Sequence, residues 1–114
     1  MVGIDIEEVE RFKNLSSKVL NRVYTVQEIE YCNSKAKPET HFAGMWCVKE
    51  AVVKCLNNLQ FPVSEIEVLH KENGAPYIKI SSKIKEYFDE NNIRGIDISI
   101  SHTNNYATAI AILR

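Results

Sequence analysis

The chain has 114 residues, 45% of them apolar, with only four glycines and three prolines. This length fits one compact domain spanning residues 1–114 and leaves no room for a second core. The formal charge of −1, from 14 basic and 15 acidic side chains, gives no chain-wide attraction to nucleic acid or to an anionic membrane. So small a domain builds a deep binding site more easily between subunits than within one chain, which favours an oligomer.

No stretch approaches the ~18 apolar residues that cross a bilayer, and the acidic start lacks a basic segment followed by an apolar one. We therefore expect neither export nor membrane insertion, and a cytoplasmic location. Cys32, Cys47 and Cys55 form no C-x-x-C pair and leave one unpaired in any disulfide scheme, which fits a reducing compartment. We interpret them as buried thiols.

The first third of the chain predicts a strand followed by two helices. The short alternating segment Val2–Ile6 is typical of a strand, and apolar residues at helical spacing predict a helix over Glu7–Leu20. Thr25 and Glu28 have the spacing of a capping box, in which two side chains satisfy free backbone donors. A short helix is therefore predicted to begin there and to end before Pro38.

The segment Phe42–Leu59 predicts the longest helix, because Gly44 is its only glycine and it contains no proline. Its core face is indicated by residues that fall on one side at 100° per residue: Val48, Val52, Cys55 and Leu59. A hairpin is predicted by two alternating runs around turn-prone residues: Ile66–Leu69, then Asn73, Gly74 and Pro76, then Tyr77–Ile80.

The last third predicts a helix and two strands. Ser81 or Ser82 can cap a helix that runs to about Asn91. Alternation over residues 96–100 and the run Tyr106–Leu113 predict two strands joined by a loop at residues 102–105. The order of elements predicts an α+β fold, with a mainly antiparallel sheet and helices packed on one face.

Polar residues interrupt the apolar pattern at three places: Asp5; the group Lys49, Glu50 and Lys54; and Ser101 with His102. Each has a simpler interpretation when taken alone. An aspartate suits a strand end, and a histidine suits a loop. A Glu/Lys pair at i,i+4 suits a solvated helix face, where it contributes about 0.3–0.5 kcal/mol.

Helical geometry places Trp46, Glu50 and Lys54 on one face, opposite the apolar side. A tryptophan beside a carboxylate and an ammonium group suggests a partly buried polar site. Mg²⁺ prefers oxygen ligands and completes its octahedron with water and substrate phosphates, so Asp5 and Glu50 could be its two carboxylates. Lys54 would then face the same phosphates as a point charge, and a nearby histidine could donate a further hydrogen bond.

Four segments, in this order, resemble the signatures of bacterial holo-[acyl carrier protein] synthases: GIDIEEVERF (Gly3–Phe12), FAGMWCVKEAVVKCL (Phe42–Leu56), NGAPY (Asn73–Tyr77) and SISHT (Ser99–Thr103). The segment RVYTVQEIEYC (Arg22–Cys32) is similar to the part of that family that lies between the first two. The likeness covers essentially the whole chain, and four ordered motifs are far more specific than one.

The resemblance implies a homotrimer of the 4′-phosphopantetheinyl transferase fold with active sites between subunits, in which Asp5 and Glu50 hold Mg²⁺. It implies that coenzyme A lies across the interface, near Lys49, Lys54, Gly74, Pro76, Ser101, His102 and Thr103. In this family a serine of apo-acyl carrier protein attacks the β-phosphate of coenzyme A and adenosine 3′,5′-bisphosphate leaves, which supports fatty acid biosynthesis. Asp5, Glu50 and Lys54 are the expected catalytic residues, and either Glu50 or a metal-bound water would take the proton.

Two features depart from the family pattern. The first strand begins two or three residues early, and Met45 with Trp46 replaces an arginine followed by phenylalanine. We place Met45 on the flank of the long helix, where the family arginine is expected to grip a coenzyme A phosphate, so Met45→Arg should lower the KM for coenzyme A. The string WCVKEAVVK is similar to the WxxKExxxK motif of the larger surfactin-synthetase type of transferase.

Arg11, Lys18 and Arg22 fall within about 40° of one another on a helical wheel. Because carrier proteins of this type are acidic, we expect this face to dock the carrier; a merely solvated face is the alternative. Two other functions are considered: transfer to a secondary-metabolite carrier, and a catalytically silent module that binds carrier or nucleotide. A Ser-His hydrolase is disfavoured because Ser101 and His102 are adjacent and no G-x-S-x-G elbow exists.

Overall fold

The computed structural model describes residues 1–56 and 61–114. Its first half contains β1 (Val2–Glu8), the 3-10 helix η1 (Val9–Phe12), α1 (Ser17–Val23), α2 (Val26–Asn33) and α3 (Pro38–Leu56). Its second half contains the 3-10 helix η2 (Val63–Glu65), β2 (Glu67–His70), β3 (Pro76–Lys79), α4 (Ser82–Glu90), β4 (Ile96–His102) and β5 (Tyr106–Leu113). The α+β class predicted from the sequence is confirmed.

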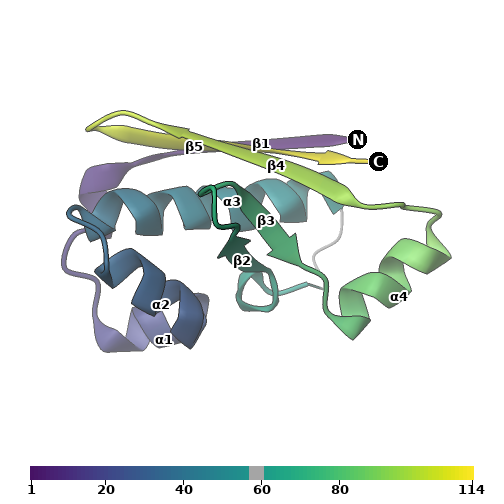
Figure 1. Cartoon of the computed structure of the whole chain (residues 1–114), viewed down its shortest axis with the longest axis horizontal. Coiled ribbons are helices and arrows are strands. Elements are labelled where there is room, and N and C mark those ends of the chain that lie inside the picture. Colours follow the sequence, from purple (N-terminus) through teal and green to yellow (C-terminus); the bar gives the residue numbers. More distant parts are fainter. Residues whose placement is uncertain (57–60) are drawn as a thin grey trace.

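The elements form layers, with α3 in the middle (Figure 1). A three-stranded antiparallel sheet in the order β1-β5-β4 lies on one side of α3. On its other side lie α1, α2 and the separate hairpin β2–β3, so the strands form two sheets rather than one (Figure 1). Helices therefore cover only one face of the three-stranded sheet, as the sequence predicts.

Small residues let α3 lie close to the sheet. A Cβ atom on Gly3 of β1 would overlap the carbonyl oxygen of Ala51, so only glycine fits there. The thiol of Cys47 donates to the carbonyl of Ala107 in β5 at 3.3 Å, and Gly44 faces Ile100 of β4. The helix thus crosses beneath all three strands, and its opposite side is buried against α2 and the hairpin.

The predicted helix over Glu7–Leu20 is wrong. Residues 7 and 8 continue β1, where Glu7 pairs with Ala107, and η1 follows. Asn14 then takes a positive φ of 57°, and the Ser16 side chain accepts a hydrogen bond from the backbone of Val19 to cap α1. Pairing with β5 therefore overrides the local helical spacing in this segment.

Other local predictions are confirmed. The Thr25/Glu28 capping box is complete, and Ser81 caps α4. The long helix begins four residues earlier than predicted, at Pro38, where proline suits a first helical position; the expected core residue Leu59 lies outside the described residues. All three cysteines are free and buried, and burial raises the pKa of Cys32 and Cys47 to about 12. Among the described helices, none has the length and apolar character needed to cross a membrane.

Candidate active site

The strand β1 aims Asp5 at α3. Because side chains alternate along a strand, Asp5 and Glu7 share the half-buried face while Ile4 and Ile6 point away from the helix. The ammonium group of Lys54, in the last turn of α3, donates to Asp5 Oδ1 and to the carbonyl of Ile4, both at 3.0 Å. Asp5 and Lys54, which come from two of the three places where polar residues interrupt the apolar pattern, are therefore in direct contact.

Glu50 lies one helical turn before Lys54 and next to the same carboxylate. Burial raises the pKa of Glu50, and the negative charges of Asp5 and Glu7 raise it further, while Lys54 opposes them. The side chain of Asp5 is only 12% exposed, and its second oxygen, Oδ2, is buried with no hydrogen-bond partner among the described residues. The site therefore holds crowded carboxylates and an acceptor that lacks a donor.

The sequence prediction missed Glu7. Its side chain is 16% exposed and accepts from the guanidinium group of Arg11 at 2.6 Å. The sequence contained a signal for Glu7, because it stands two residues after Asp5 and therefore shares the same face of a strand. Assigning this residue to a helix hid the relationship.

These residues fit a divalent cation. An unpartnered buried oxygen and a carboxylate with a raised pKa are both stabilised by a nearby positive charge. Across residues 1–56 and 61–114, no three His, Cys, Asp or Glu side chains converge as a ready-made metal site. Asp5 and Glu50 would therefore hold Mg²⁺ with the help of water or substrate oxygens, as this ion commonly requires.

Lys49 contradicts the expectation that it contacts coenzyme A. Its side chain is fully buried, and its ammonium group lies 2.9 Å from a carboxylate oxygen of Glu28. It also donates to the backbone carbonyls of Ile66 at 2.5 Å and Val63 at 3.3 Å. The long helix is covered on two sides, so a residue next to Glu50 in sequence points into the protein.

Met45 is also placed differently from the prediction. It is 2% exposed, and its sulfur lies 3.7 Å from the thiol of Cys32 in α2. It therefore belongs to the core rather than to the flank of α3. An arginine here would carry a charge into that core instead of reaching a ligand.

The segments expected to meet the phosphates lie near the start of α3, at the other end of the helix from Lys54. Pro76 pairs with His70 across the hairpin, the His70 ring stacks on Tyr31, and His41 lies between Tyr31 and His102. His41 and Glu50 are nine residues apart, which separates them by about 13 Å along the axis and places them on opposite sides of the helix. Within one chain, the carboxylates and the His102 segment therefore do not face a common site.

The remaining predicted residues of these segments are Gly74, Ser101 and Thr103. Gly74 lies at the exposed hairpin turn with a φ of +87°, a conformation that favours glycine. Ser101 is exposed near the end of β4. The hydroxyl oxygen of Thr103 accepts from the backbone of Asn105 and Tyr106, at 3.2 and 3.1 Å, and so shapes the β4–β5 turn.

The three predicted docking residues are all exposed, but they do not share one helix. Arg11 belongs to η1, whereas Lys18 and Arg22 are one turn apart on α1. A mainly apolar hollow of about 190 Å³ separates η1 from α1, and Trp46 lines it. The remaining lining residues are Arg11, Phe12, Leu15, Val19, Val23 and Tyr24. Arg11 thus lines an apolar hollow beside the carboxylate site, and Lys18 and Arg22 lie on α1, the helix that contributes Val19 and Val23 to it.

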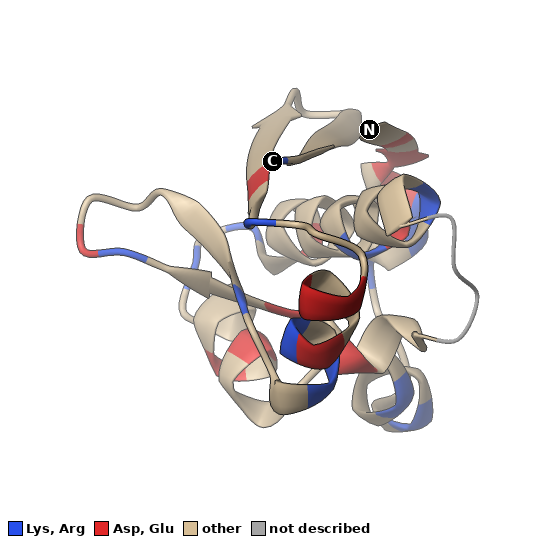
Figure 2. Cartoon of the chain, turned by 90° about the vertical axis from the view of Figure 1, so that its right-hand side faces the viewer, with Lys and Arg blue, Asp and Glu red and all other residues tan. Residues whose placement is uncertain are grey.

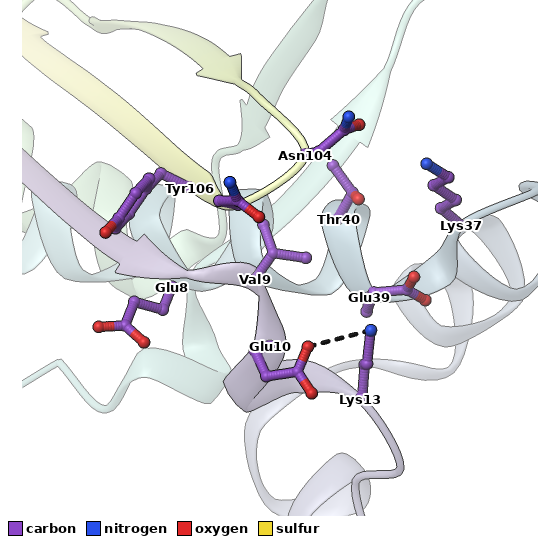
Figure 3. A pocket seen from close by; sticks show the side chains of 10 residues that line it. Glu8, Val9, Glu10, Lys13, Lys37, Glu39, Thr40, Asn104 and Tyr106 are labelled. Atoms are coloured by element: carbon purple, nitrogen blue, oxygen red, sulfur yellow. Dashed lines mark ion pairs between the residues drawn. The ribbon is translucent and has the colours of Figure 1, made fainter.

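A larger hollow, of about 500 Å³, lies between the end of β1, the start of α3 and the β4–β5 turn (Figure 3). It is polar, with three carboxylates and two ammonium groups among its lining residues: Glu8, Val9, Glu10, Lys13, Lys37, Glu39, Thr40, Asn104, Asn105 and Tyr106. Lys13 and Glu10 form an ion pair there at 3.0 Å. None of the predicted catalytic or binding residues lines it.

Comparison with known proteins agrees with the motifs. Residues 1–111 match the model of the 4′-phosphopantetheinyl transferase superfamily. The chain is 44% identical to a holo-[acyl-carrier-protein] synthase of Thermoanaerobacter sp. strain X514, over 97% of this chain and 84% of that protein. It is 42% identical to the synthase of Caldicellulosiruptor saccharolyticus, over 97% and 93% of the two chains.

A solved structure extends this agreement to the fold. The Helicobacter pylori holo-[acyl-carrier-protein] synthase, crystallised with coenzyme A, superposes with a TM-score of 0.85 at 30% identity and covers both chains completely. The resemblance drawn from the sequence is therefore confirmed over the whole length. The chain belongs to the 4′-phosphopantetheinyl transferase superfamily, among the holo-[acyl-carrier-protein] synthases.

Proposed function

We propose that this chain is a magnesium-dependent holo-[acyl-carrier-protein] synthase, which moves 4′-phosphopantetheine from coenzyme A to a serine of apo-acyl carrier protein. The observation that carries the proposal is the contact between Lys54 and Asp5 beside Glu50, with one buried Asp5 oxygen lacking a partner. We also propose fatty acid synthesis as its setting. We propose the cytoplasm as its location, because an odd number of free cysteines fits a reducing compartment.

Each residue has a distinct part in this transfer. When bound, Mg²⁺ supplies Lewis-acid stabilisation of charge on phosphate oxygens. Asp5 and Glu50 would hold the ion, and the half-exposed Lys54 can turn from Asp5 toward a phosphate without unfolding any element. Glu50, or a water held beside it, would accept the proton of the carrier serine. Adenosine 3′,5′-bisphosphate is the leaving group.

Glu50→Gln tests this assignment, because it removes one negative charge from a partly exposed position on α3 and leaves the buried core unchanged. We expect transfer, followed as release of adenosine 3′,5′-bisphosphate in Mg²⁺, to fall at least about 100-fold with an unchanged melting temperature. Glu86→Gln, on the exposed side of α4, is the matched control and should keep full activity. A chelator should abolish wild-type activity, and added Mg²⁺ should restore it. Near-normal turnover of Glu50→Gln would refute the metal assignment.

The carrier is proposed to dock at the apolar hollow beside Trp46 and along α1, the helix that carries Lys18 and Arg22. Basic side chains around an apolar centre complement an acidic helix that carries a few apolar residues. Trp46, which lines the hollow, lies one helical turn before Glu50 on the same side of α3. A docked carrier would therefore bring its serine close to the carboxylates.

Lys18→Glu with Arg22→Glu tests the docking surface and leaves the Arg11–Glu7 ion pair intact. We expect a higher KM for the carrier, an unchanged KM for coenzyme A and a weaker dependence of carrier KM on salt. Lys85→Glu is the control, because it reverses the charge of one residue in the same way but lies on α4, outside the proposed docking surface. If the double variant keeps the wild-type carrier KM, the carrier docks elsewhere.

The oligomer is proposed to be a homotrimer, held together through the uncovered face of the three-stranded sheet. Val2, Ile4 and Ile6 of β1 are each at least 62% exposed, and Ile112 of β5 is 45% exposed beside them. In Figure 2 most of the ribbon of the three-stranded sheet has the colour of uncharged residues, with charged residues at only a few positions. A contiguous apolar face of this kind marks an interaction surface. Separation of the carboxylates from the His102 segment within one chain also supports sites shared between subunits.

Light scattering should return three times the 13.0 kDa mass of one chain. Ile112→Lys places a charge on the proposed interface, opposite Val2, and should dissociate the trimer. Ile80→Lys is the control, because Ile80 is similarly exposed but follows β3, away from the sheet. A wild-type protein that stays monomeric at micromolar concentration would contradict the trimer while leaving the chemistry of Asp5 and Glu50 open to its own test.

A further inference from the structure

Arg11 and Glu7 connect the apolar hollow beside Trp46 with the carboxylate site. The Arg11 guanidinium group lies 2.6 Å from a carboxylate oxygen of Glu7, and the Arg11 side chain is 67% exposed whereas that of Glu7 is 16% exposed. Arg11 lines the apolar hollow, and both residues line a separate hollow of about 290 Å³. One ion pair therefore joins the surface proposed for the carrier to the residues proposed for Mg²⁺.

Glu7 belongs to the carboxylate site by its position on β1. It follows Asp5 by two residues on the same face of the strand, which separates their Cα atoms by about 7 Å. Burial raises the pKa of Glu50, and the negative charges of Asp5 and Glu7 raise it further. Three carboxylates thus lie beside two cationic groups, those of Lys54 and Arg11. The mutual repulsion of the carboxylates favours the ion pair of Glu7 with Arg11.

A cation held by Asp5 and Glu50 would change that balance. Mg²⁺ carries twice the charge of a guanidinium group, so it would attract the Glu7 carboxylate away from Arg11. Glu7 can turn its side chain toward the ion without any change in the pairing of β1 with β5. In the described parts of the chain Arg11 has no ion-pair partner besides Glu7. Once released, its guanidinium group would be free to bind a carboxylate of another protein.

We propose that Glu7 exchanges partners between the two sites: it pairs with Arg11 in the absence of Mg²⁺, and it releases Arg11 to an acidic residue of the carrier when Mg²⁺ is bound. The inference rests on the proposed function for the identity of the metal and of the carrier. It adds that recognition of the carrier depends on the metal. By thermodynamic linkage, the carrier would strengthen Mg²⁺ binding by the same factor.

Equilibrium binding of fluorescently labelled apo-acyl carrier protein tests this exchange. Fluorescence anisotropy is measured without coenzyme A, so that no transfer takes place, over a range of Mg²⁺ concentrations. The wild-type protein should bind the carrier about two- to five-fold more tightly in Mg²⁺ than in a sodium salt of equal ionic strength, which corresponds to the strength of one partly exposed ion pair. Equal affinity in the two salts would overturn the proposal.

Three variants identify the residues responsible. Glu7→Gln should bind the carrier without Mg²⁺ about as tightly as the wild type binds it with Mg²⁺, and its affinity should no longer respond to the metal. Glu10→Gln is the matched control, because it removes the same charge from the neighbouring ion pair with Lys13 and should keep the wild-type response. Arg11→Gln should bind the carrier more weakly and should lose the response. A Glu7→Gln protein that keeps the wild-type response would overturn the proposal.

The comparison also removes the effect of Mg²⁺ on the acidic carrier itself, because that effect is the same for every variant. Circular dichroism checks the fold of Glu7→Gln, which changes a partly exposed residue. If this variant does not fold, the exposed Arg11→Gln decides, since a wild-type response to Mg²⁺ would count against the exchange. Carrier modification is measured separately by intact mass. Transfer by the wild type, with a carrier affinity that ignores Mg²⁺, would defeat this inference and leave the proposed function intact.

Discussion

Replacing Lys49 with methionine should destabilise the protein strongly and should have little direct effect on ligand binding. Methionine has a similar length but removes the charge that faces Glu28 at 2.9 Å in a fully buried setting. Glu28 would still accept from the backbone of Thr25 and Val68, both at 2.8 Å, but its negative charge would lose its cation. Breaking a buried pair in this way costs about 3–5 kcal/mol, a large fraction of the roughly 5–15 kcal/mol that stabilises a small domain.

Urea unfolding at one fixed protein concentration measures the effect, because oligomer stability depends on concentration. Lys49→Met with Glu28→Gln removes both charges and should be less destabilised than the two single variants added together. Lys83→Met, an exposed lysine on α4, is the control. A Lys49→Met protein that unfolds like wild type but shows a raised KM for coenzyme A would refute the burial of this side chain and restore its predicted ligand contact.

Three further results are expected. Met45→Arg should lower the melting temperature by well over 5 °C without improving the KM for coenzyme A, since it places a charge in the core; a stable variant with a lower KM would contradict this. Gly3→Ala should yield little folded protein by circular dichroism, because the new methyl group would overlap the carbonyl of Ala51, and a wild-type melting curve would show that β1 can shift. The pKa of His41 and His70 is lowered from 6.5 in the folded chain, so the unfolded chain binds protons more tightly; the free energy of unfolding should fall as pH drops below about 6.5, and His41→Gln with His70→Gln should reduce that fall.

Most of the fold could be predicted because its signals are local. The Thr25/Glu28 capping box, the hairpin turn at Gly74 and the alternating strands each depend on residues close in sequence. The segment after Ile6 could not be predicted in this way. Whether it extends a strand or starts a helix is decided by β5, about a hundred residues away, whose backbone pairs with Glu7 and Glu8.

The candidate site was predicted in part. Asp5, Glu50 and Lys54 were placed together on residue chemistry and motif order, and the structure brings them into contact or close proximity. The orientation of Lys49 was wrong because a helical wheel assumes one buried side, whereas α3 has the sheet on one side and the α2–hairpin layer on the other. Charge alone does not show that a lysine has a buried carboxylate partner.

The proximity of His41, His70 and His102 could not be predicted from spacing, since they are 29 and 32 residues apart and belong to three different elements. Only the packing of the hairpin against α2 and α3 brings His70 onto Tyr31. This is the usual limit of a single sequence: it names the reactive side chains, but tertiary contacts decide which of them meet.

The central claim is group transfer, and the intact mass of the carrier protein tests it most directly. Apo-acyl carrier protein incubated with this chain, coenzyme A and Mg²⁺ should gain the mass of one phosphopantetheine group, with an equal amount of adenosine 3′,5′-bisphosphate released. A carrier that keeps its apo mass, in a sample that another holo-[acyl-carrier-protein] synthase converts fully, would contradict the account. If coenzyme A still bound under those conditions, the chain would be a binding module of the same fold.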